Sequence, residues 1–435
     1  MLDRRSFLVR TGLALGGGVL AAGCRPRLEL VRGEAADLQD WRAVRGEFNL
    51  SRDYIHLTGF LLASHPRPVR EAIETHRRGL DENPANYLHD HAQRLEADVL
   101  NAAAEYLGVD PTEIALTDST TMGLGLLYGG LKLREGQDIL TTHHDHYSTA
   151  TALRLRAERT GASVRTISLY ANPATATEEE ITKAVVRALK PRTRVVAVTW
   201  VHSCTGVKLP IRRIADALAE VNARRDDGDH ALLCVDGVHG IGVDDATMAG
   251  LGCDFFVAGT HKWMFGPRGT GLVWGKSQAW PAATAMIPTF NRRAGQIWVK
   301  AIPPEDIPPA ALMTPGGFHS FEHRWALGEA FRFHQRIGKA RIAERIHSLN
   351  RQLKEGLAKM PHIKLHTPLP DNLSAGIVCF EVDGTTPEEV VTRLRERQII
   401  ASVTPYAIRY ARLAPSLLTS PEEIDTALRE VRALA

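Results

Sequence analysis

The sequence has little of what would mark a zinc-knuckle, disulfide-stabilised, membrane-spanning or nucleic-acid-binding protein. Its five cysteines are scattered without CxxC or CxxxxC spacing, so neither a zinc knuckle nor a disulfide framework is predicted. No stretch of the mature chain approaches the roughly 18 apolar residues of a membrane span. No basic run exceeds three residues, and 53 Lys+Arg against 50 Asp+Glu give a net charge of +3, so no nucleic-acid partner is expected.

What is present is an ordinary globular composition. Hydrophobic residues make up 44% and charged residues 24% of 435 residues. These values are typical of a folded chain, and the length suits two or three units of roughly 150 residues each.

The first 24 residues predict an export signal. Asp3–Leu8 (DRRSFL) is a twin-arginine pattern, and the apolar, glycine-rich stretch Thr11–Gly23 after it is too short for a structural span. Leu20–Cys24 resembles a lipobox with Ala21 where Leu is usual, so cleavage to a soluble periplasmic protein and lipid attachment at Cys24 both stay open. We expect passage through the twin-arginine (Tat) translocase. That pathway exports proteins that have already folded, often with a cofactor loaded.

The middle of the chain predicts a mostly parallel sheet. From about residue 110 to 275, short β-rich runs alternate with helical stretches such as the amphipathic Ile211–Arg225. The expected strands are Asp138–Thr142, Ser163–Leu169, Arg194–Val201, Ala231–Asp236, Asp254–Ala258 and Gly271–Trp274.

A proline-rich stretch from residue 280 to 315 interrupts this alternation and suggests a domain boundary. After it we expect a long helical segment, Phe321–Lys359, then strands at Ile363–His366 and Ser374–Val382 and helices at Pro387–Arg397 and Pro421–Leu434. The predicted organisation is an N-terminal segment over residues 25–60, a large domain over 61–315 and a smaller α+β domain over 316–435.

Three signals stand at the ends of expected strands. Asp236 ends one apolar strand, and Lys262 follows the next, 26 residues on, ahead of a Gly-Pro-Arg-Gly turn. The third signal is a hydroxyl-rich strand-to-helix turn, Leu116–Gly123. Taken singly, each has an ordinary explanation: a strand-end turn former, a solvated lysine and a plain N-cap.

Jointly, the three signals suit pyridoxal phosphate. A lysine amine whose pKa is lowered can form a Schiff base with an aldehyde. A carboxylate against the pyridine nitrogen keeps that nitrogen protonated, which makes the ring an electron sink. Hydroxyls and backbone N–H groups at a helix start can hold a phosphate.

With these residues the chain resembles the class V aminotransferases of the fold type I pyridoxal-phosphate enzymes, closest to the isopenicillin-N-epimerase-like branch. The resemblance covers roughly Tyr54 to Val431. It implies an α/β fold with a mostly parallel central sheet and a smaller α+β C-terminal domain. It also implies a homodimer, in which a loop near residues 315–325 reaches towards the partner's phosphate.

The resemblance implies a role for each matching residue. Catalytic roles fall on Lys262 (Schiff base), Asp236 (pyridinium partner) and His146, whose imidazole would stack on the pyridine ring. Substrate carboxylate binding falls on Arg412, whose planar fork suits a carboxylate. The remaining cofactor contacts are His239 to the phenolic oxygen, Ser203 where the family often has Asn, and Thr120, Thr121, Thr260 and His261 at the phosphate. The contact of Thr260 is shifted by one position, because the family's Ser stands at Gly259 here.

The composition of the run His143–His146 (HHDH) could also indicate a metal site. Consecutive strand residues point to opposite faces, which favours the cofactor interpretation, and no metal is expected.

The reaction stays open among chemistries that start by removing the Cα proton. An exported member is similar to periplasmic pyoverdine-tailoring enzymes, which favours amino-group chemistry on a secreted, peptide-like metabolite such as a siderophore. The alternatives are an epimerase or a small amino-acid aminotransferase, a C–S or sulfoxide lyase, and a non-enzymatic pyridoxal-phosphate-binding scaffold. Cysteine desulfuration is disfavoured, because residues 401–412 contain no cysteine and Cys379 lies in an apolar strand.

Overall fold

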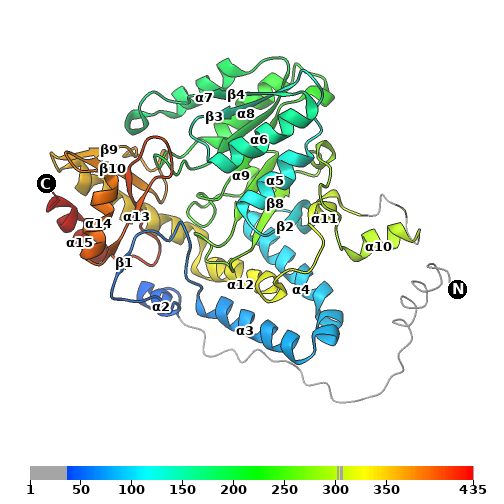
Figure 1. The fold of residues 1–435 in the computed structure, drawn as a ribbon, viewed down its shortest axis with the longest axis horizontal. Helices are drawn as coiled ribbons and strands as arrows, with labels where there is room; N and C mark the ends of the chain where they lie inside the picture. The colour runs from blue at the N-terminus through cyan, green and yellow to red at the C-terminus, as the bar shows by residue number, and fades with distance from the viewer. Residues whose placement is uncertain (1–36, 301–302, 304–306, 435) are drawn as a thin grey trace. The chain divides into compact units, whose positions relative to one another are not determined.

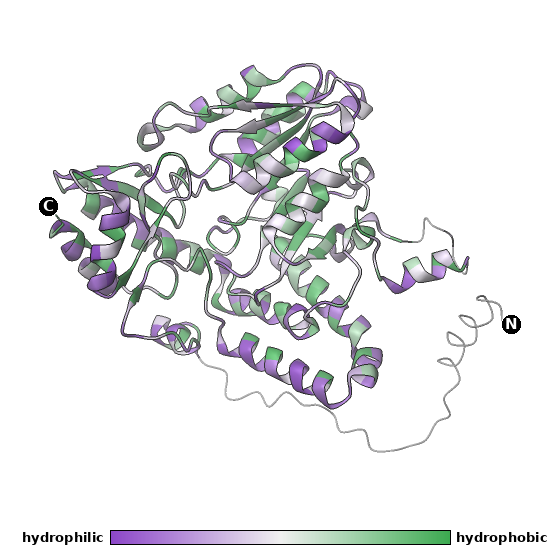
Figure 2. Ribbon diagram, in the orientation of Figure 1, coloured by the Kyte–Doolittle hydropathy of each residue, from purple (hydrophilic) through white to green (hydrophobic). Residues whose placement is uncertain are grey.

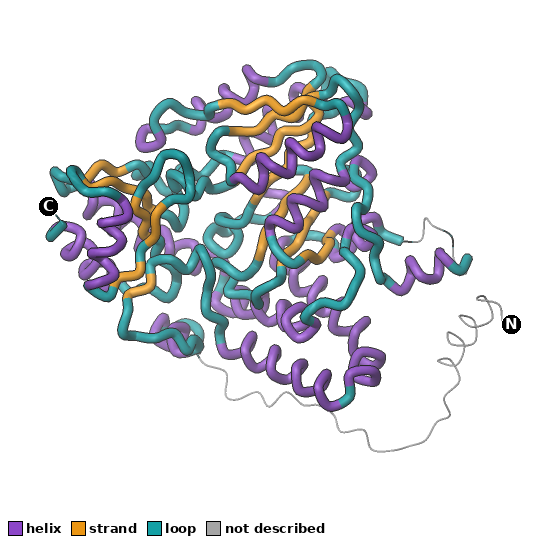
Figure 3. The backbone as a smooth tube through the Cα atoms, viewed as in Figure 1, coloured by secondary structure: helices purple, strands orange, loops and turns teal. Residues whose placement is uncertain are grey.

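A seven-stranded sheet organises the middle of the chain (Figures 1 and 3). The computed structural model describes residues 37–300, 303 and 307–434, so the predicted signal and Cys24 lie outside the described residues. The strand order is β2-β8-β7-β6-β5-β3-β4; β8 runs antiparallel to both of its neighbours, and the other pairings are parallel. The strands are β2 (Ile114–Thr117), β3 (Asp138–Thr142), β4 (Ser163–Ile167), β5 (Thr193–Thr199), β6 (Leu232–Asp236), β7 (Phe255–Gly259) and β8 (Gly271–Gly275).

The expected mostly parallel α/β fold is therefore confirmed. β6, β7 and β8 are buried at every position, which is why they read as continuous apolar runs. The edge strand β4 is partly exposed and carries polar residues.

The helices of this part are α2 (Trp41–Gly46), α3 (Arg67–Glu82), α4 (Pro84–Leu107), α5 (Thr120–Gly130), α6 (Tyr147–Thr160), α7 (Glu178–Ala188), α8 (Ile211–Asn222), α9 (Met248–Leu251), α10 (Arg292–Trp298) and α11 (Pro309–Met313). α5 packs against α6 and lies on β7 and β8. α8 ends three residues before the predicted Arg225. None of the described helices is both long and apolar enough to cross a membrane.

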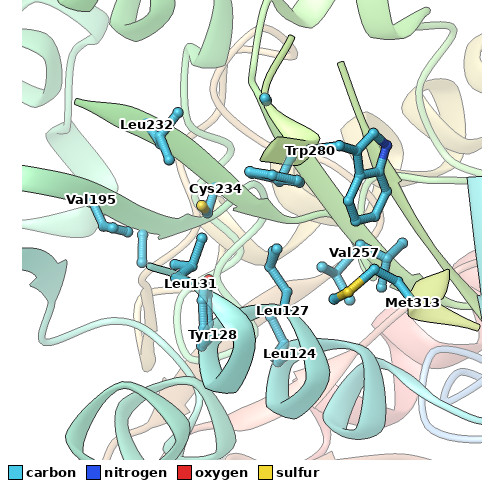
Figure 4. Packing of buried hydrophobic residues seen from close by; sticks show 14 of the residues in the cluster. Leu124, Leu127, Tyr128, Leu131, Val195, Leu232, Cys234, Val257, Trp280 and Met313 are labelled. Carbon is cyan, nitrogen blue, oxygen red and sulfur yellow. The ribbon is translucent and has the colours of Figure 1, made fainter. Parts of the chain in front are cut away.

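The main core lies between α5 and the sheet. Side chains of α5 share one buried cluster with side chains from six strands, β2, β3, β5, β6, β7 and β8, and Figure 4 labels Leu127, Val257 and Cys234 among them. Figure 2 shows the matching hydropathy, with apolar residues along the strands and polar residues along outer helices such as α3. This core fixes the start of α5 beside the carboxyl ends of the strands.

A second, antiparallel sheet forms near the C-terminus. Its order is β12-β13-β10-β9, and α13 and α15 pack together beside it. Its elements are β9 (Ile363–Leu365), β10 (Val378–Val382), β12 (Ser402–Val403), β13 (Ala411–Leu413), α13 (Lys339–Ala358), α14 (Pro387–Glu396) and α15 (Pro421–Arg432). The N-terminal segment joins this region, because β1 (Ile55–His56) pairs in parallel with β11 (Ile399–Ile400).

The long helical segment expected over Phe321–Lys359 is two helices, so that prediction is wrong in detail. α12 (Phe321–Ile337) packs on α3 and α4, whereas α13 packs on β9 and α15. Gly338 separates the two helices with a φ of 97°, a conformation that glycine adopts without strain. The domain boundaries predicted at residues 60 and 315 stay predictions.

Candidate active site

The predicted cofactor residues gather at one edge of the large sheet. The carboxyl ends of parallel strands meet there, and α/β proteins bind ligands at such edges. The strands and the residues after them are β2 with Thr120 and Thr121, β3 with His146, β5 with Ser203, β6 with Asp236 and His239, and β7 with Thr260, His261 and Lys262.

Lys262 lies in a tight turn after β7. The Phe265 N–H donates to the Lys262 carbonyl over 3.0 Å, and Phe265 takes a left-handed φ of 54° that is uncommon for a non-glycine residue. Burial lowers the pKa of the Lys262 amine to about 8; Arg412 contributes to this and Asp236 opposes it. A neutral, nucleophilic amine is therefore accessible close to neutral pH.

Asp236 is a buried carboxylate whose loss of hydration is only partly offset by a hydrogen bond and nearby positive charge. It is 2% exposed, and the Val238 N–H donates to its Oδ1 over 3.1 Å. Burial raises the pKa of Asp236 to about 6, and the Val238 hydrogen bond and the Lys262 ammonium only partly oppose this. A carboxylate in this setting is stabilised by a cationic N–H group, such as a protonated pyridine nitrogen.

His239 lies three residues beyond the end of β6 and is 5% exposed. Its Nδ1 accepts a hydrogen bond from Trp263 Nε1 at 3.3 Å. Burial, reinforced by Lys262, lowers the pKa of His239 well below its usual range, so the ring is neutral. The ring of Phe60 packs edge-on against it, with centroids 5.8 Å apart.

Asp145 anchors the segment that carries His146. One carboxylate oxygen accepts hydrogen bonds from the Thr141 hydroxyl (3.0 Å), the Thr142 N–H (2.9 Å) and the Thr142 hydroxyl (2.7 Å), and the other accepts from the Thr199 N–H (2.7 Å). These four bonds tie β3 to β5, so the backbone next to His146 is held in place.

His146 is the N-cap of α6. Its Nδ1 lies 2.8 Å from the Ser148 hydroxyl oxygen and accepts from the Ser148 N–H. Burial lowers the pKa of His146, followed by the positive charges of Lys262 and Arg412. His146 therefore lies close enough to Lys262 and Arg412 for their charges to act on its imidazole.

The start of α5 has the groups of a phosphate cradle. The Ser119 hydroxyl oxygen accepts from the Met122 N–H (3.1 Å), and the Thr120 hydroxyl oxygen accepts from the Gly259 N–H (2.7 Å). A Cβ at Gly259 would approach that Thr120 oxygen to 2.9 Å and the Thr120 nitrogen to 3.1 Å. Glycine at this position therefore lets β7 and the helix start lie close together. Thr121 is exposed in the first turn.

Thr260 and His261 differ in what they face. The Thr260 hydroxyl lies 2.6 Å from the Thr270 hydroxyl, which donates to the Pro267 carbonyl, and Thr260 is fully buried. This hydroxyl therefore braces the turn after β7, and its phosphate contact stays a prediction. His261 is half-buried, and burial together with the Lys262 charge lowers its pKa.

Arg412 reaches the site from β13 of the second sheet. It is 2% exposed and donates to the Ser402 hydroxyl (3.2 Å), the Ser203 carbonyl (3.0 Å) and the Val403 carbonyl (2.9 Å). Its guanidinium lies over the Phe60 ring, 4.7 Å from the centroid. Because a guanidinium carries five N–H donors, Arg412 retains donors for a carboxylate.

The histidines of the run at 143–146 diverge. His143 is exposed, His144 stacks on Tyr170 with centroids 4.1 Å apart, and His146 caps α6. Within the part of the chain that the structure describes, no group of three His, Cys, Asp or Glu side chains is arranged to hold a metal ion.

Sequence reasoning missed three residues of the site: Phe60, Trp263 and Tyr406. Tyr406 contacts Ser203, and Phe60 contacts Arg412 and His239. Trp263 directly follows Lys262 in the chain, so its position next to the predicted Schiff-base lysine could have indicated that it belongs to the site. Phe60 and Tyr406 carry no local signal, because their contacts are far away in sequence.

The assembled residues fit pyridoxal phosphate chemically. Lys262 supplies an amine for the aldehyde, Asp236 a carboxylate for the ring nitrogen, and the start of α5 donors for the phosphate. Together with a sheet in which β8 alone runs antiparallel, this set of residues defines a fold type I pyridoxal-phosphate enzyme.

Comparison with known proteins identifies the family. The family model for class V aminotransferases matches residues 63–404, and the chain belongs to that family. Among curated relatives, the isopenicillin N epimerase of Streptomyces clavuligerus is 28% identical over 402 residues, which cover 89% of this chain and 96% of that protein. A cysteine desulfurase of Klebsiella pneumoniae is 27% identical over 299 residues, which cover 66% of this chain and 67% of that protein.

Solved structures share the fold. The cystine C–S lyase C-DES, in complex with its reaction product cysteine persulfide, has a TM-score of 0.77 at 22% identity and covers 88% of this chain and 98% of its own. A C-DES mutant with glycine linked to the PLP cofactor has a TM-score of 0.79, also at 22% identity, covering 89% and 98%. The predictions of a class V, epimerase-like enzyme of fold type I that uses pyridoxal phosphate are confirmed at this level.

Proposed function

We propose that the protein acts with pyridoxal phosphate at the Cα of an amino-group-bearing substrate that carries a free carboxylate. The observation that carries this proposal is that Lys262 and Asp236 follow neighbouring strands at one edge of the large sheet and that Arg412 reaches them from β13 of the second sheet. The charges of Asp236 and Arg412 both act on the pKa of Lys262. The cofactor supplies the electron sink. Arg412 binds the carboxylate, and the Lys262 amine, whose pKa is about 8, takes a proton from Cα.

The leading specific function is amino-group chemistry on a secreted, peptide-like metabolite such as a siderophore. The twin-arginine pattern at the start of the sequence supports an exported, periplasmic enzyme. In this proposal the Tat translocase carries the folded enzyme with its cofactor already bound. The exported enzyme is then either released into the periplasm or anchored to the membrane by a lipid on Cys24.

An epimerase is the second candidate, favoured by the relative that covers 89% of this chain. A small amino-acid aminotransferase and a C–S or sulfoxide lyase share the same first proton transfer.

Desulfuration through a cysteine nucleophile has little support. Cys204, Cys234, Cys253 and Cys379 are all buried. Burial raises the pKa of the Cys204 and Cys253 thiols to about 12, and it also raises the pKa of Cys234 and Cys379. Among the described residues, therefore, no cysteine presents a reactive thiolate.

A homodimer is part of the proposal. Phe318 is 82% exposed and Met122 is 38% exposed. The two belong to one neighbourhood, because His319 pairs with Asp118, just before α5, over 3.4 Å. Covering these apolar side chains with a second copy would bring the 315–325 loop to a partner's site. Sedimentation should give twice the chain mass, and Phe318→Asp should give a monomer; a wild-type monomer would contradict this.

The function itself is tested by spectroscopy. Purified protein should show a visible absorption band that Lys262→Ala removes, which separates an enzyme from a scaffold that binds the cofactor without the lysine. L-glutamate-containing peptides should change the band, whereas free alanine should not. If only free amino acids change it, the peptide-tailoring proposal fails. Colourless protein without vitamin B6 would refute the whole proposal.

A further inference from the structure

Tyr406 faces inward from a loop in which the residues on either side of it are exposed. It lies between β12 and β13, where residues 405 and 407–409 are exposed. Its phenol oxygen lies 2.7 Å from the Ser203 hydroxyl oxygen. Its ring meets the His146 ring at 83°, with centroids 6.3 Å apart. The loop therefore directs the Tyr406 hydroxyl towards Ser203.

Ser203 connects this hydroxyl to Arg412. The Ser203 carbonyl accepts from Arg412 Nη1 over 3.0 Å, while the Ser203 hydroxyl pairs with Tyr406. The same guanidinium also donates to Ser402 and Val403, directly before the Tyr406 loop. Arg412 and the Ser203–Tyr406 pair are therefore built into one polar cluster.

The donor count of the pair leaves one O–H unused. Each hydroxyl has one proton, and the pair shares a single hydrogen bond. A phenol is the stronger donor and an aliphatic hydroxyl the better acceptor, so Tyr406 donates and Ser203 keeps its own proton. Burial raises the pKa of Tyr406, so the phenol stays protonated at neutral pH. The spare proton therefore belongs to the residue whose backbone carbonyl accepts from Arg412.

We propose that Tyr406 is a positioning residue that orients the Ser203 hydroxyl as a second donor, beside Arg412, for the α-carboxylate of an amino-acid-like substrate. This rests on the proposed function and deepens it: the Tyr406–Ser203 pair, acting together with Arg412, discriminates a free α-carboxylate from an α-amide.

The test uses holoenzyme and two probes that differ only at the α-carboxyl group, L-glutamate and L-isoglutamine. Their Kd values come from equilibrium titration of the visible band. Tyr406→Phe should raise the Kd of L-glutamate about tenfold, the size expected for a hydrogen bond to a charged group, and should leave L-isoglutamine within about twofold, the usual scatter of independent effects. The affinity of the apoprotein for pyridoxal phosphate should not change.

Two further variants separate positioning from a merely structural role. Ser203→Ala should match Tyr406→Phe, and the double variant should be no worse than Ser203→Ala, because the two act as one unit. Tyr410→Phe removes a hydroxyl from the end of the same loop, where the ring stacks on His366, and should change neither Kd. Equal weakening of both probes in Tyr406→Phe, or no weakening, overturns the inference. A wild-type band that responds to neither probe, while L-glutamate-containing peptides still change it, overturns this inference and leaves the proposed function standing.

Discussion

Trp263 donates its indole N–H to Nδ1 of His239, with 3.3 Å between the two nitrogens. An indole nitrogen is a donor only, so Nδ1 of His239 must be unprotonated. Burial keeps the ring neutral by lowering its pKa well below the usual range. The single proton of His239 therefore lies on Nε2. The residue after the predicted Schiff-base lysine thus sets the tautomer of a predicted cofactor contact.

Removing the Trp263 indole N–H should allow His239 to carry its proton on either ring nitrogen. In Trp263→Phe apoprotein, His239 should populate the Nδ1–H form, with the tautomer ratio shifted about tenfold for the loss of one hydrogen bond. Nitrogen-15 NMR of histidine-labelled protein measures this. Phe60→Leu alters the ring stacked on Trp263 but keeps the indole N–H, and it should retain the wild-type tautomer. A protonated Nδ1 in the wild type would contradict the assignment.

Asp236→Asn should stabilise the apoprotein at alkaline pH. The folded-state pKa of about 6 is above the ordinary 3.8, so folding favours the protonated acid. That contribution is present below about pH 4 and is lost as the pH rises through 6. At pH 8 the variant should gain up to about 3 kcal/mol in the free energy of unfolding, falling towards zero near pH 4.

Urea unfolding at both pH values measures this difference. The matched control is Asp145→Asn, which weakens four hydrogen bonds and should destabilise the protein at both. Destabilisation by Asp236→Asn at pH 8 would mean that the buried carboxylate has a compensating partner.

Cofactor loading should follow the titration of Lys262. Only the neutral amine is a nucleophile, so the rate at which apoprotein acquires the visible band should rise with pH, with a midpoint near the pKa of about 8. Asp236 raises that pKa, so Asp236→Asn should move the midpoint to lower pH. Lys262→Arg should give no band. A midpoint at the ordinary lysine value of 10.5 would contradict the burial argument.

Gly259→Ala should weaken cofactor binding selectively. The new Cβ would lie 2.9 Å from the Thr120 hydroxyl oxygen and force the start of α5 away from β7. Pyridoxal phosphate affinity should fall by about tenfold or more, the cost of about one charge-assisted hydrogen bond. Fluorescence titration of the apoprotein measures it.

The matched control is Gly125→Ala in the same helix, where the structure leaves open space around the Cβ. It should stabilise the helix by up to about 1 kcal/mol and leave affinity unchanged. Equal effects of the two substitutions would show that the close approach at Gly259 does not matter.

The sequence predicted the buried strands well, because a strand buried on both faces is a continuous run of apolar residues. The strand β3 was predicted to the residue, and the apolar runs before Asp236 and Lys262 are β6 and β7. The sequence predicted one long helix where there are two, because the helical pattern continues across the break at Gly338. The residues around Gly338 read as one helix, yet α12 and α13 pack on different partners.

Side-chain partners were the harder part. The phosphate contact of Thr260 stays a prediction, and the pairing of its hydroxyl with Thr270 across the turn had no signal in the sequence. Tyr406 and Ser203 are 203 positions apart and meet through the second sheet. Nothing in the spacing of residues predicts such a pair, because it depends on how two sheets are placed.

The sequence by itself determined the class of chemistry, because an acid and a lysine at the ends of successive buried strands must reach the same edge of a parallel sheet. Tertiary structure alone decided how those groups behave. Burial sets the pKa of Lys262 and Asp236, Trp263 sets the tautomer of His239, and the second sheet brings Arg412 and Tyr406 to Ser203. Desolvation and hydrogen bonding depend on which distant segments exclude water from a side chain, and local pattern does not encode that.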